Sequence, residues 1–107
     1  MPQWTEDSFY AHIAEFNPLG SVNLIIEFVQ RIDRESFFTE YGFGSVQASL
    51  NIRLASTNRI YFGLMSTPEG FKAWYHNDDY SGKYTWIEGS VVEILNYIQS
   101  NLLGNSL

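Results

Sequence analysis

Cysteine is absent from this sequence, basic side chains are few, and no long apolar run occurs. Without cysteine, a disulfide framework and a thiolate zinc site are both excluded. The longest strongly apolar run, from Leu24 to Val29, is interrupted by Glu27 and is far too short to cross a bilayer. The first ten residues show neither the basic start nor the apolar centre of a signal peptide. We therefore expect a cytoplasmic protein.

The charge balance is acidic, with 12 Asp and Glu residues against 6 Lys and Arg residues and a net charge of -6. Nucleic acids and anionic membranes attract proteins through basic patches, and this sequence has no basic stripe. Acidic domains are instead steered towards basic partners, and the attraction mainly raises the association rate. We expect a basic protein partner and no binding to nucleic acid or membranes. The alternative is that the negative charge only keeps the protein soluble.

The length and composition are those of one folded domain. Hydrophobic residues make up 45% of the 107 residues and aromatic residues 17%. A chain of this size can bury about two-thirds of its unfolded surface, which is enough for a core without metals or disulfides. No linker, internal repeat or low-complexity segment is evident. We therefore expect a single domain over residues 1–107.

Two helices are expected before residue 36. The first opens at Thr5, carries acidic residues in its first turn and stops at Asn17. Its buried stripe is Phe9, Ile13 and Phe16. The next segment, residues 21–35, fits a strand or a helix, because its apolar residues satisfy both periods. We favour a helix, since that interpretation gathers the polar residues on the opposite face. Its apolar face is then Val22, Ile25, Ile26, Val29 and Ile32.

A third helix is expected at the end of the chain. Ser90 followed by Glu93 has the spacing of a capping box, and Gly104 stands where a left-handed C-terminal cap would lie. The face between them is Val91, Ile94, Leu95, Ile98 and Leu102.

Strands are expected between the second and third helices. Residues 46–54 alternate cleanly, with an apolar face of Val46, Ala48, Leu50, Ile52 and Leu54. "RIYFGLM", "FKAWYH" and "KYTWIE" continue the pattern and are separated by the turn signals "TPEG" and "NDDYSG". The sequence thus predicts an α+β fold, an antiparallel meander of about four strands with two N-terminal helices and one C-terminal helix packed on the sheet.

No catalytic group can be assembled convincingly from this sequence. Only His12 and His76 are present, and His12 is expected at the surface or boundary of the first helix. His76 precedes Asp78, Asp79 and Ser81, but neighbouring residues on a turn point in divergent directions and do not form a water-excluding cleft. We therefore predict that the protein is not an enzyme.

Residues 77–88 resemble the calcium loop of the EF-hand family. Acceptor residues fall on the first, third, fifth, ninth and twelfth positions, and Gly82 falls on the sixth. Asn77 replaces the usual leading aspartate, however, and Ser90 begins a helix cap where an exiting helix should already run. The preceding "FKAWYH" is as natural a strand as a helix. We expect no metal and no cofactor, and interpret the segment as a hairpin.

Aromatic residues are more numerous than a core of this size requires, and most fall between Phe37 and Trp86. Tyr61 and Phe62 are expected on opposite faces of the sheet, as are Trp74 and Tyr75, so that large rings lie on the face without helices. Tyrosine and tryptophan anchors dominate the energy of protein interfaces. The predicted contact surface is Trp74, His76, Asp78, Asp79, Tyr80, Tyr84 and Trp86, with Glu69 and Glu88 at the rim.

A small, acidic, cysteine-free and aromatic-rich α+β chain resembles the immunity proteins of bacterial toxin systems, including those of contact-dependent inhibition. The resemblance is one of type and assigns no role to any residue. It implies a protein-binding inhibitor that covers the basic active-site cleft of a cognate toxin, in particular a nuclease. The alternatives are a phage-encoded inhibitor that mimics nucleic acid, a homo-oligomeric assembly protein and a small-ligand-binding domain.

Overall fold

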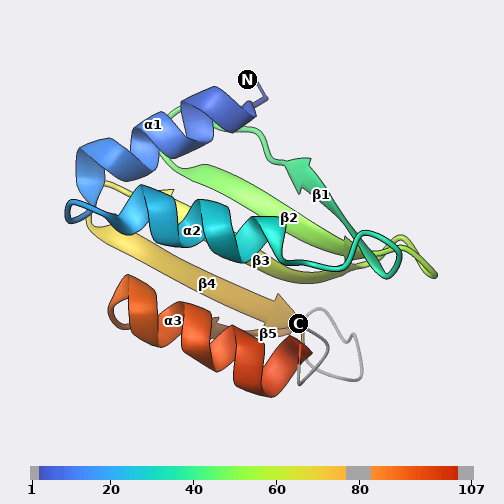
Figure 1. Ribbon diagram of the computed structural model, residues 1–107. Helices are drawn as coiled ribbons and strands as arrows, with labels where there is room; N and C mark the ends of the chain where they lie inside the picture. The colour runs from blue at the N-terminus through green and yellow to red at the C-terminus, as the bar shows by residue number, and fades with distance from the viewer. Residues whose placement is uncertain (1–2, 77–82, 104–107) are drawn as a thin grey trace.

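A computed structural model describes residues 3–76 and 83–103 of the chain. The helices are α1 (Glu6–Phe16), α2 (Ser21–Gln30) and α3 (Val91–Ile98), and a π-helical turn (Gln99–Leu103) continues α3. The strands are β1 (Phe37–Tyr41), β2 (Ala48–Leu54), β3 (Ile60–Thr67), β4 (Gly70–His76) and β5 (Tyr84–Ile87) (Figure 1). The predicted α+β fold is confirmed, with five strands in place of about four.

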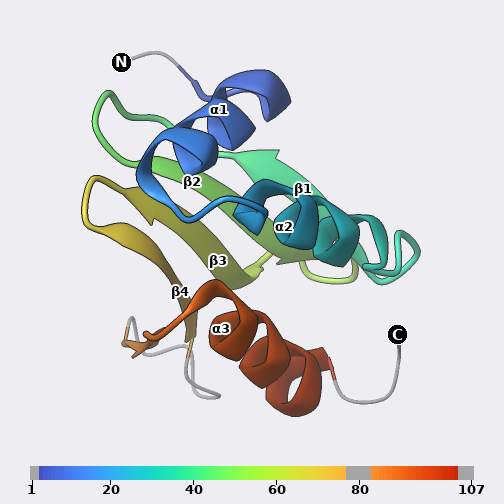
Figure 2. The same cartoon turned by 60° about the vertical axis from the view of Figure 1, so that its left-hand side comes forward.

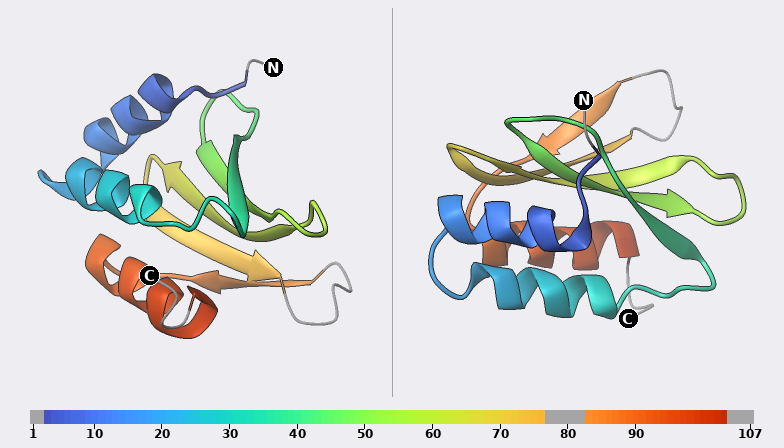
Figure 3. Two further views of the ribbon diagram at one scale, coloured as in Figure 1. Left: turned by 45° about the vertical axis from the view of Figure 1, so that its right-hand side comes forward. Right: turned by 90° about the horizontal axis from the view of Figure 1, so that it is seen from above.

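The five strands form one antiparallel sheet in the order β1-β2-β3-β4-β5. Each strand therefore pairs with its neighbour in sequence, as expected of a meander. The three helices all lie on the same side of this sheet (Figure 2 and Figure 3). We call the other side, which no described helix covers, the open face.

The core lies between the helices and the sheet. Strand register brings Leu50, Leu64, Ala73 and Ile87 side by side across β2 to β5, and all four are buried. The helices pack their apolar stripes against this row. Those stripes include Phe9 and Ile13 from α1, Ile25, Phe28 and Val29 from α2, and Ile94 and Ile98 from α3.

Both predicted N-terminal helix caps are confirmed. The Thr5 hydroxyl accepts a hydrogen bond from the Ser8 backbone N–H, and the Ser8 side chain accepts one from Thr5 in return. At α3, the Ser90 hydroxyl accepts from the Glu93 N–H while the Glu93 carboxylate accepts from the Ser90 N–H. These bonds satisfy backbone donors that a helix leaves unpaired at its start.

Residues 21–30 form a helix, so the helical interpretation of this ambiguous segment is confirmed. Gly20 precedes it with a φ of 92°, a left-handed conformation that glycine adopts without strain. The burial of Phe28 extends the predicted apolar face by one residue. The helix ends earlier than expected, because Asp33 then accepts hydrogen bonds from the Glu35 N–H and the Ser36 hydroxyl in a local turn.

Three details of the sheet differ from the prediction. No strand was predicted at Phe37–Tyr41, yet this segment pairs along its length with β2. Val46 was expected in the next strand, but it precedes β2 and is 59% exposed. The third difference is the face of the sheet on which Tyr61 lies.

The predicted C-terminal helix cap at Gly104 lies outside the described residues.

Tyr61 and Phe62 do not lie on opposite faces as predicted. The β2–β3 register shifts between Ile52 and Arg53, which face Phe62 and Ile60 respectively, so Tyr61 is the extra residue of a β-bulge. The Tyr61 hydroxyl donates to the Leu102 carbonyl oxygen at 2.7 Å, and its ring packs against the core. The bulge thus turns both rings towards the helices.

Among the described residues, no helix is long and apolar enough to span a bilayer.

Candidate functional site

Strand β4 divides its side chains between the two faces of the sheet. Phe71 and Ala73 are buried on the helical side, where the Tyr75 hydroxyl also lies 3.2 Å from the Tyr97 hydroxyl of α3. By alternation, Lys72, Trp74 and His76 lie on the open face. The predicted division between Trp74 and Tyr75 is therefore confirmed.

Strand β5 adds two more rings to the open face. Its register places Trp86 directly opposite Trp74, and Tyr84 directly opposite His76. Residues opposite each other in an antiparallel pair share a face. We call Trp74, His76, Tyr84 and Trp86 the ring cluster. All four belong to the predicted contact surface, and the structure brings them together.

Each ring in the cluster contacts at least one neighbour edge-on or at a tilt. The Tyr84 centroid lies 5.5 Å from that of Trp86 and 5.7 Å from that of Trp74, while Trp74 lies 5.5 Å from His76. Such geometries match the positive edge of one ring to the negative face of another and add about 0.5–1.5 kcal/mol per pair beyond burial. The cluster is thus ordered by its own contacts before any partner binds.

Gly63 on β3 determines where the Trp74 indole lies. The two residues are paired across β3 and β4, and a Cβ atom added to Gly63 would fall 2.5 Å from Cε2 of Trp74. Ordinary carbon–carbon contacts are about 3.5–4.0 Å, so any larger residue displaces the indole. Glycine in a strand interior often marks such a close approach. Gly63 therefore supports the inner ring of the cluster.

The outer rings remain accessible to a partner. Tyr84 is 49% exposed and Trp86 is 39% exposed. The Lys72 ammonium lies 4.4 Å from the centroid of the Trp86 ring, within cation–π range. The Trp86 ring thus already holds a basic group from its own chain.

The β1–β2 side of the open face is different in character. Arg53 donates from Nε and Nη2 to Oε1 of Glu40, at 3.1 and 2.9 Å, and from Nη1 to the Asn58 carbonyl oxygen. Both charges are therefore satisfied within the chain. Phe38 is a large exposed ring on this side, at 39% exposure.

Of the predicted acidic residues, the structure describes Glu69 and Glu88, which lie together at one end of the β4–β5 hairpin. Glu69 precedes the first residue of β4 and Glu88 follows the last residue of β5, and the two line one small hollow. They flank the end of the hairpin opposite to residues 77–82, so Glu69 and Glu88 do not border His76 and Tyr84. Asp78, Asp79 and Tyr80 lie outside the described residues.

The flanks of the calcium-like segment are strands. β4 enters it and β5 occupies its eighth to eleventh positions, whereas an EF-hand loop joins two helices. Residues 77–82 themselves lie outside the described part. Within residues 3–76 and 83–103, no group of three histidine or acidic side chains could hold a metal ion.

His12 is a structural connection between α1 and the sheet. Its Nε2 lies 2.8 Å from the Val46 carbonyl oxygen, and its Nδ1 lies 2.7 Å from the Ser66 hydroxyl. A carbonyl oxygen only accepts, so Nε2 donates to Val46, and in the neutral ring Nδ1 then accepts from the Ser66 hydroxyl. Although the pair resembles a base and a nucleophile, Ser66 is fully buried, so its hydroxyl is not in contact with solvent. The expected boundary position of His12 agrees with its partial burial.

Two residues of the site were missed from the sequence. Lys72 alternates with Ala73 in "FKAWYH" and so belongs to the same face as Trp74, and Gly63 interrupts the strand "YFGLM". Both patterns are visible in the sequence, but neither shows which ring the residue contacts.

Comparisons with protein-family models, curated proteins and solved structures found no match for this chain. The ring cluster and its surroundings are therefore the features of the molecule from which a function can be inferred.

Proposed function

We propose that this protein is an immunity protein, which neutralises a cognate bacterial nuclease toxin by binding it. The open face of the β4–β5 hairpin is the contact surface, and the toxin's basic active-site cleft is the target. The observation that carries this proposal is the ring cluster, with Tyr84 and Trp86 exposed on a sheet face that no described helix covers.

The cluster has the features of a binding hot spot. Tyrosine and tryptophan are enriched among residues whose truncation costs at least about 2 kcal/mol of binding energy. Rings that are held by neighbouring rings lose little conformational entropy on binding. An exposed strand surface presents these rings side by side, which suits a protein surface.

Charge supports a basic partner. The chain has a net charge of -6, and Asp78 and Asp79 lie in the segment that joins the two ring-bearing strands. A nuclease cleft is basic because it binds phosphates, and opposite charge accelerates association with it. Binding there excludes the nucleic acid substrate, so inhibition needs no chemistry from this chain.

The test is affinity purification from the native host followed by mass spectrometry. We expect a basic protein whose nuclease activity is inhibited by the wild-type chain. Loss of the outer rings in Tyr84→Ala with Trp86→Ala is expected to weaken binding at least thirtyfold, about 2 kcal/mol. Phe38→Ala is the matched control, because Phe38 has the same 39% exposure as Trp86 on a distant strand of the sheet.

A second pair of variants tests the charge. Asp78→Lys with Asp79→Lys is expected to abolish toxin binding while circular dichroism remains unchanged. Glu15→Lys with Glu35→Lys makes the same change in net charge at two exposed positions elsewhere and is expected to retain binding. Equal affinity of the first pair and wild type would show that the contact surface is elsewhere. Recovery of no basic partner, with a stable oligomer in size-exclusion chromatography, would favour self-assembly instead.

A further inference from the structure

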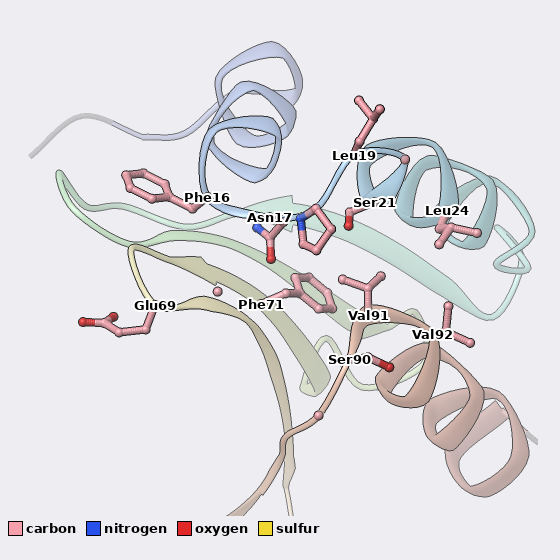
Figure 4. A pocket seen from close by; sticks show the side chains of 14 residues that line it. Phe16, Asn17, Leu19, Ser21, Leu24, Glu69, Phe71, Ser90, Val91 and Val92 are labelled. Carbon is pink, nitrogen blue, oxygen red and sulfur yellow. The ribbon is translucent and has the colours of Figure 1, made fainter.

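A second surface lies on the helical side of the sheet, where the α1–α2 turn, the start of β4 and the start of α3 converge. These segments enclose a groove of about 740 Å³ (Figure 4). The rings of Trp74 and Trp86 lie on the opposite face of the sheet. Residues 77–82 follow the other end of β4. The groove is therefore separate from the ring cluster.

The groove is mainly apolar. Phe71 and Val91 are nearly buried at its base, at 7% and 8% exposure. Leu24 from α2 and Val92 from α3 face it from opposite sides (Figure 4), and both remain substantially exposed. Leu19, at the tip of the α1–α2 turn, is completely exposed. Single exposed apolar residues are common, but a contiguous set around a groove marks an interaction site.

Acidic side chains border this groove. Glu69 is the one charged residue among its described lining residues. Further carboxylates lie just beyond the lining, on Glu88 beside Glu69 and on Glu93 beside Gly89. The base beside Glu69 and Glu88, Lys72, extends over the Trp86 ring. At the other end of the groove, the hollow that shares Leu24 and Val92 with it carries one charge of each sign, on Glu27 and Arg31. The excess negative charge of the rim therefore lies at the Glu69 end.

We infer that this groove is a second docking site, and that its occupant is an apolar segment of another protein that carries basic side chains. Apolar side chains of that segment fill the space between Leu24 and Val92, and a lysine or arginine meets Glu69. Such a segment combines buried apolar area with charge complementarity, which are the two properties that the groove offers. This inference does not depend on the proposed toxin inhibition, because it concerns a different face.

The test begins with a phage-displayed library of random twelve-residue peptides, selected on the full chain. We expect enriched peptides to contain at least two large apolar residues and a net positive charge. Fluorescence anisotropy then measures the affinity of each labelled peptide for variants of the chain. Leu24→Gln with Val92→Gln is expected to weaken binding at least tenfold. Both positions are exposed, and glutamine is a good helix former, so this variant retains the fold.

Charge is tested separately. Glu69→Lys is expected to weaken binding of the basic peptides at least fivefold, whereas Glu35→Lys, the matched control at another exposed acid, leaves it unchanged. Tyr84→Ala, which removes a ring of the cluster other than the one that holds Lys72, also leaves peptide binding unchanged and so distinguishes this site from the ring cluster. Failure to enrich any peptide, enrichment of acidic peptides, or equal binding by the Leu24→Gln, Val92→Gln variant would overturn the proposal. A dimer of the wild-type chain that this variant abolishes in sedimentation would assign the groove to a second copy and overturn it too.

Discussion

Gly63→Ala is the most informative single substitution in the ring cluster. The new Cβ atom would lie 2.5, 2.6 and 2.7 Å from Cε2, Cζ2 and Nε1 of Trp74. Normal contact requires about 3.5 Å, so the indole must move by about 1 Å or turn to another rotamer. Trp74 contacts both His76 and Tyr84, and its displacement disturbs the whole cluster.

The magnitude follows from two opposing effects. Overpacking of this kind costs about 1–3 kcal/mol of stability. Alanine in place of glycine in a strand is otherwise favourable by about 0.5–1 kcal/mol, because it restricts the unfolded chain. In a Trp74→Ala background the clash is absent, so Gly63→Ala should stabilise the protein there. The favourable effect of alanine is common to both backgrounds and cancels, so the coupling energy between the two positions equals the overpacking cost of about 1–3 kcal/mol.

The assay is urea unfolding of the wild type, both single variants and the double variant, followed by far-UV circular dichroism. With an m-value of about 1–3 kcal/mol per molar urea, Gly63→Ala lowers the midpoint by about 1 M in the wild-type background. It raises the midpoint slightly when Trp74 is alanine. An equal loss of stability in both backgrounds would refute the packing of Trp74 on Gly63.

The remaining predictions concern the helix cap and the bulge. Ser90→Ala removes the hydroxyl that accepts from the Glu93 N–H in the α3 capping box and is expected to cost about 1 kcal/mol in urea unfolding. Hydrogen bonds from the Ser90 backbone and hydroxyl lower the pKa of Glu93, so its stabilisation is present above about pH 4.3 and is lost as the pH falls through the lower folded-state pKa. Glu93→Gln should therefore flatten the decline of the urea midpoint in acid. Tyr61→Phe leaves the Leu102 carbonyl without its donor and should cost about 1 kcal/mol by the same assay.

Each of these three predictions would be contradicted by a specific result. An unchanged midpoint in Ser90→Ala would mean that the cap contributes nothing, and an equally steep acid limb in Glu93→Gln would assign the pH dependence to other carboxylates. A Tyr61→Phe variant as stable as wild type would place the Tyr61 hydroxyl in water rather than on Leu102.

Local signals in the sequence were sufficient for most of the fold. Thr5 and Ser90 begin their helices through hydrogen bonds to residues three positions away, and such patterns can be recognised without tertiary structure. The alternating segments from residue 48 onward became strands because a period of two buries one face. The segment 21–30 could only be favoured as a helix, since its burial against the sheet decides between two periods.

What the sequence did not predict depends on distant partners. Strand Phe37–Tyr41 lacks clean alternation and forms by pairing with β2, for example Phe37 with Leu54. The bulge at Tyr61 likewise follows from the β2–β3 register. In each case the deciding contact joins segments whose spatial relation is absent from any local pattern.

In the candidate site, too, local patterns predicted some features and contacts between distant segments decided the others. Alternation correctly put Trp74 on the opposite face from Tyr75, but the support from Gly63 requires the β3–β4 register. Glu69 was expected at the rim of the ring surface, whereas it lines the apolar groove at the other end of β4. The order of turns along the chain does not reveal which of them meet in space.

The most direct measurement of the central claim is isothermal titration of the partner recovered from the host with the wild-type chain, Tyr84→Ala with Trp86→Ala, and Phe38→Ala. If the ring cluster is the contact surface, the paired substitution weakens binding at least thirtyfold while Phe38→Ala changes it less than threefold, which is about 2 kcal/mol against less than about 0.7 kcal/mol. Equal affinities for all three proteins, each with the wild-type circular dichroism spectrum, would contradict the claim.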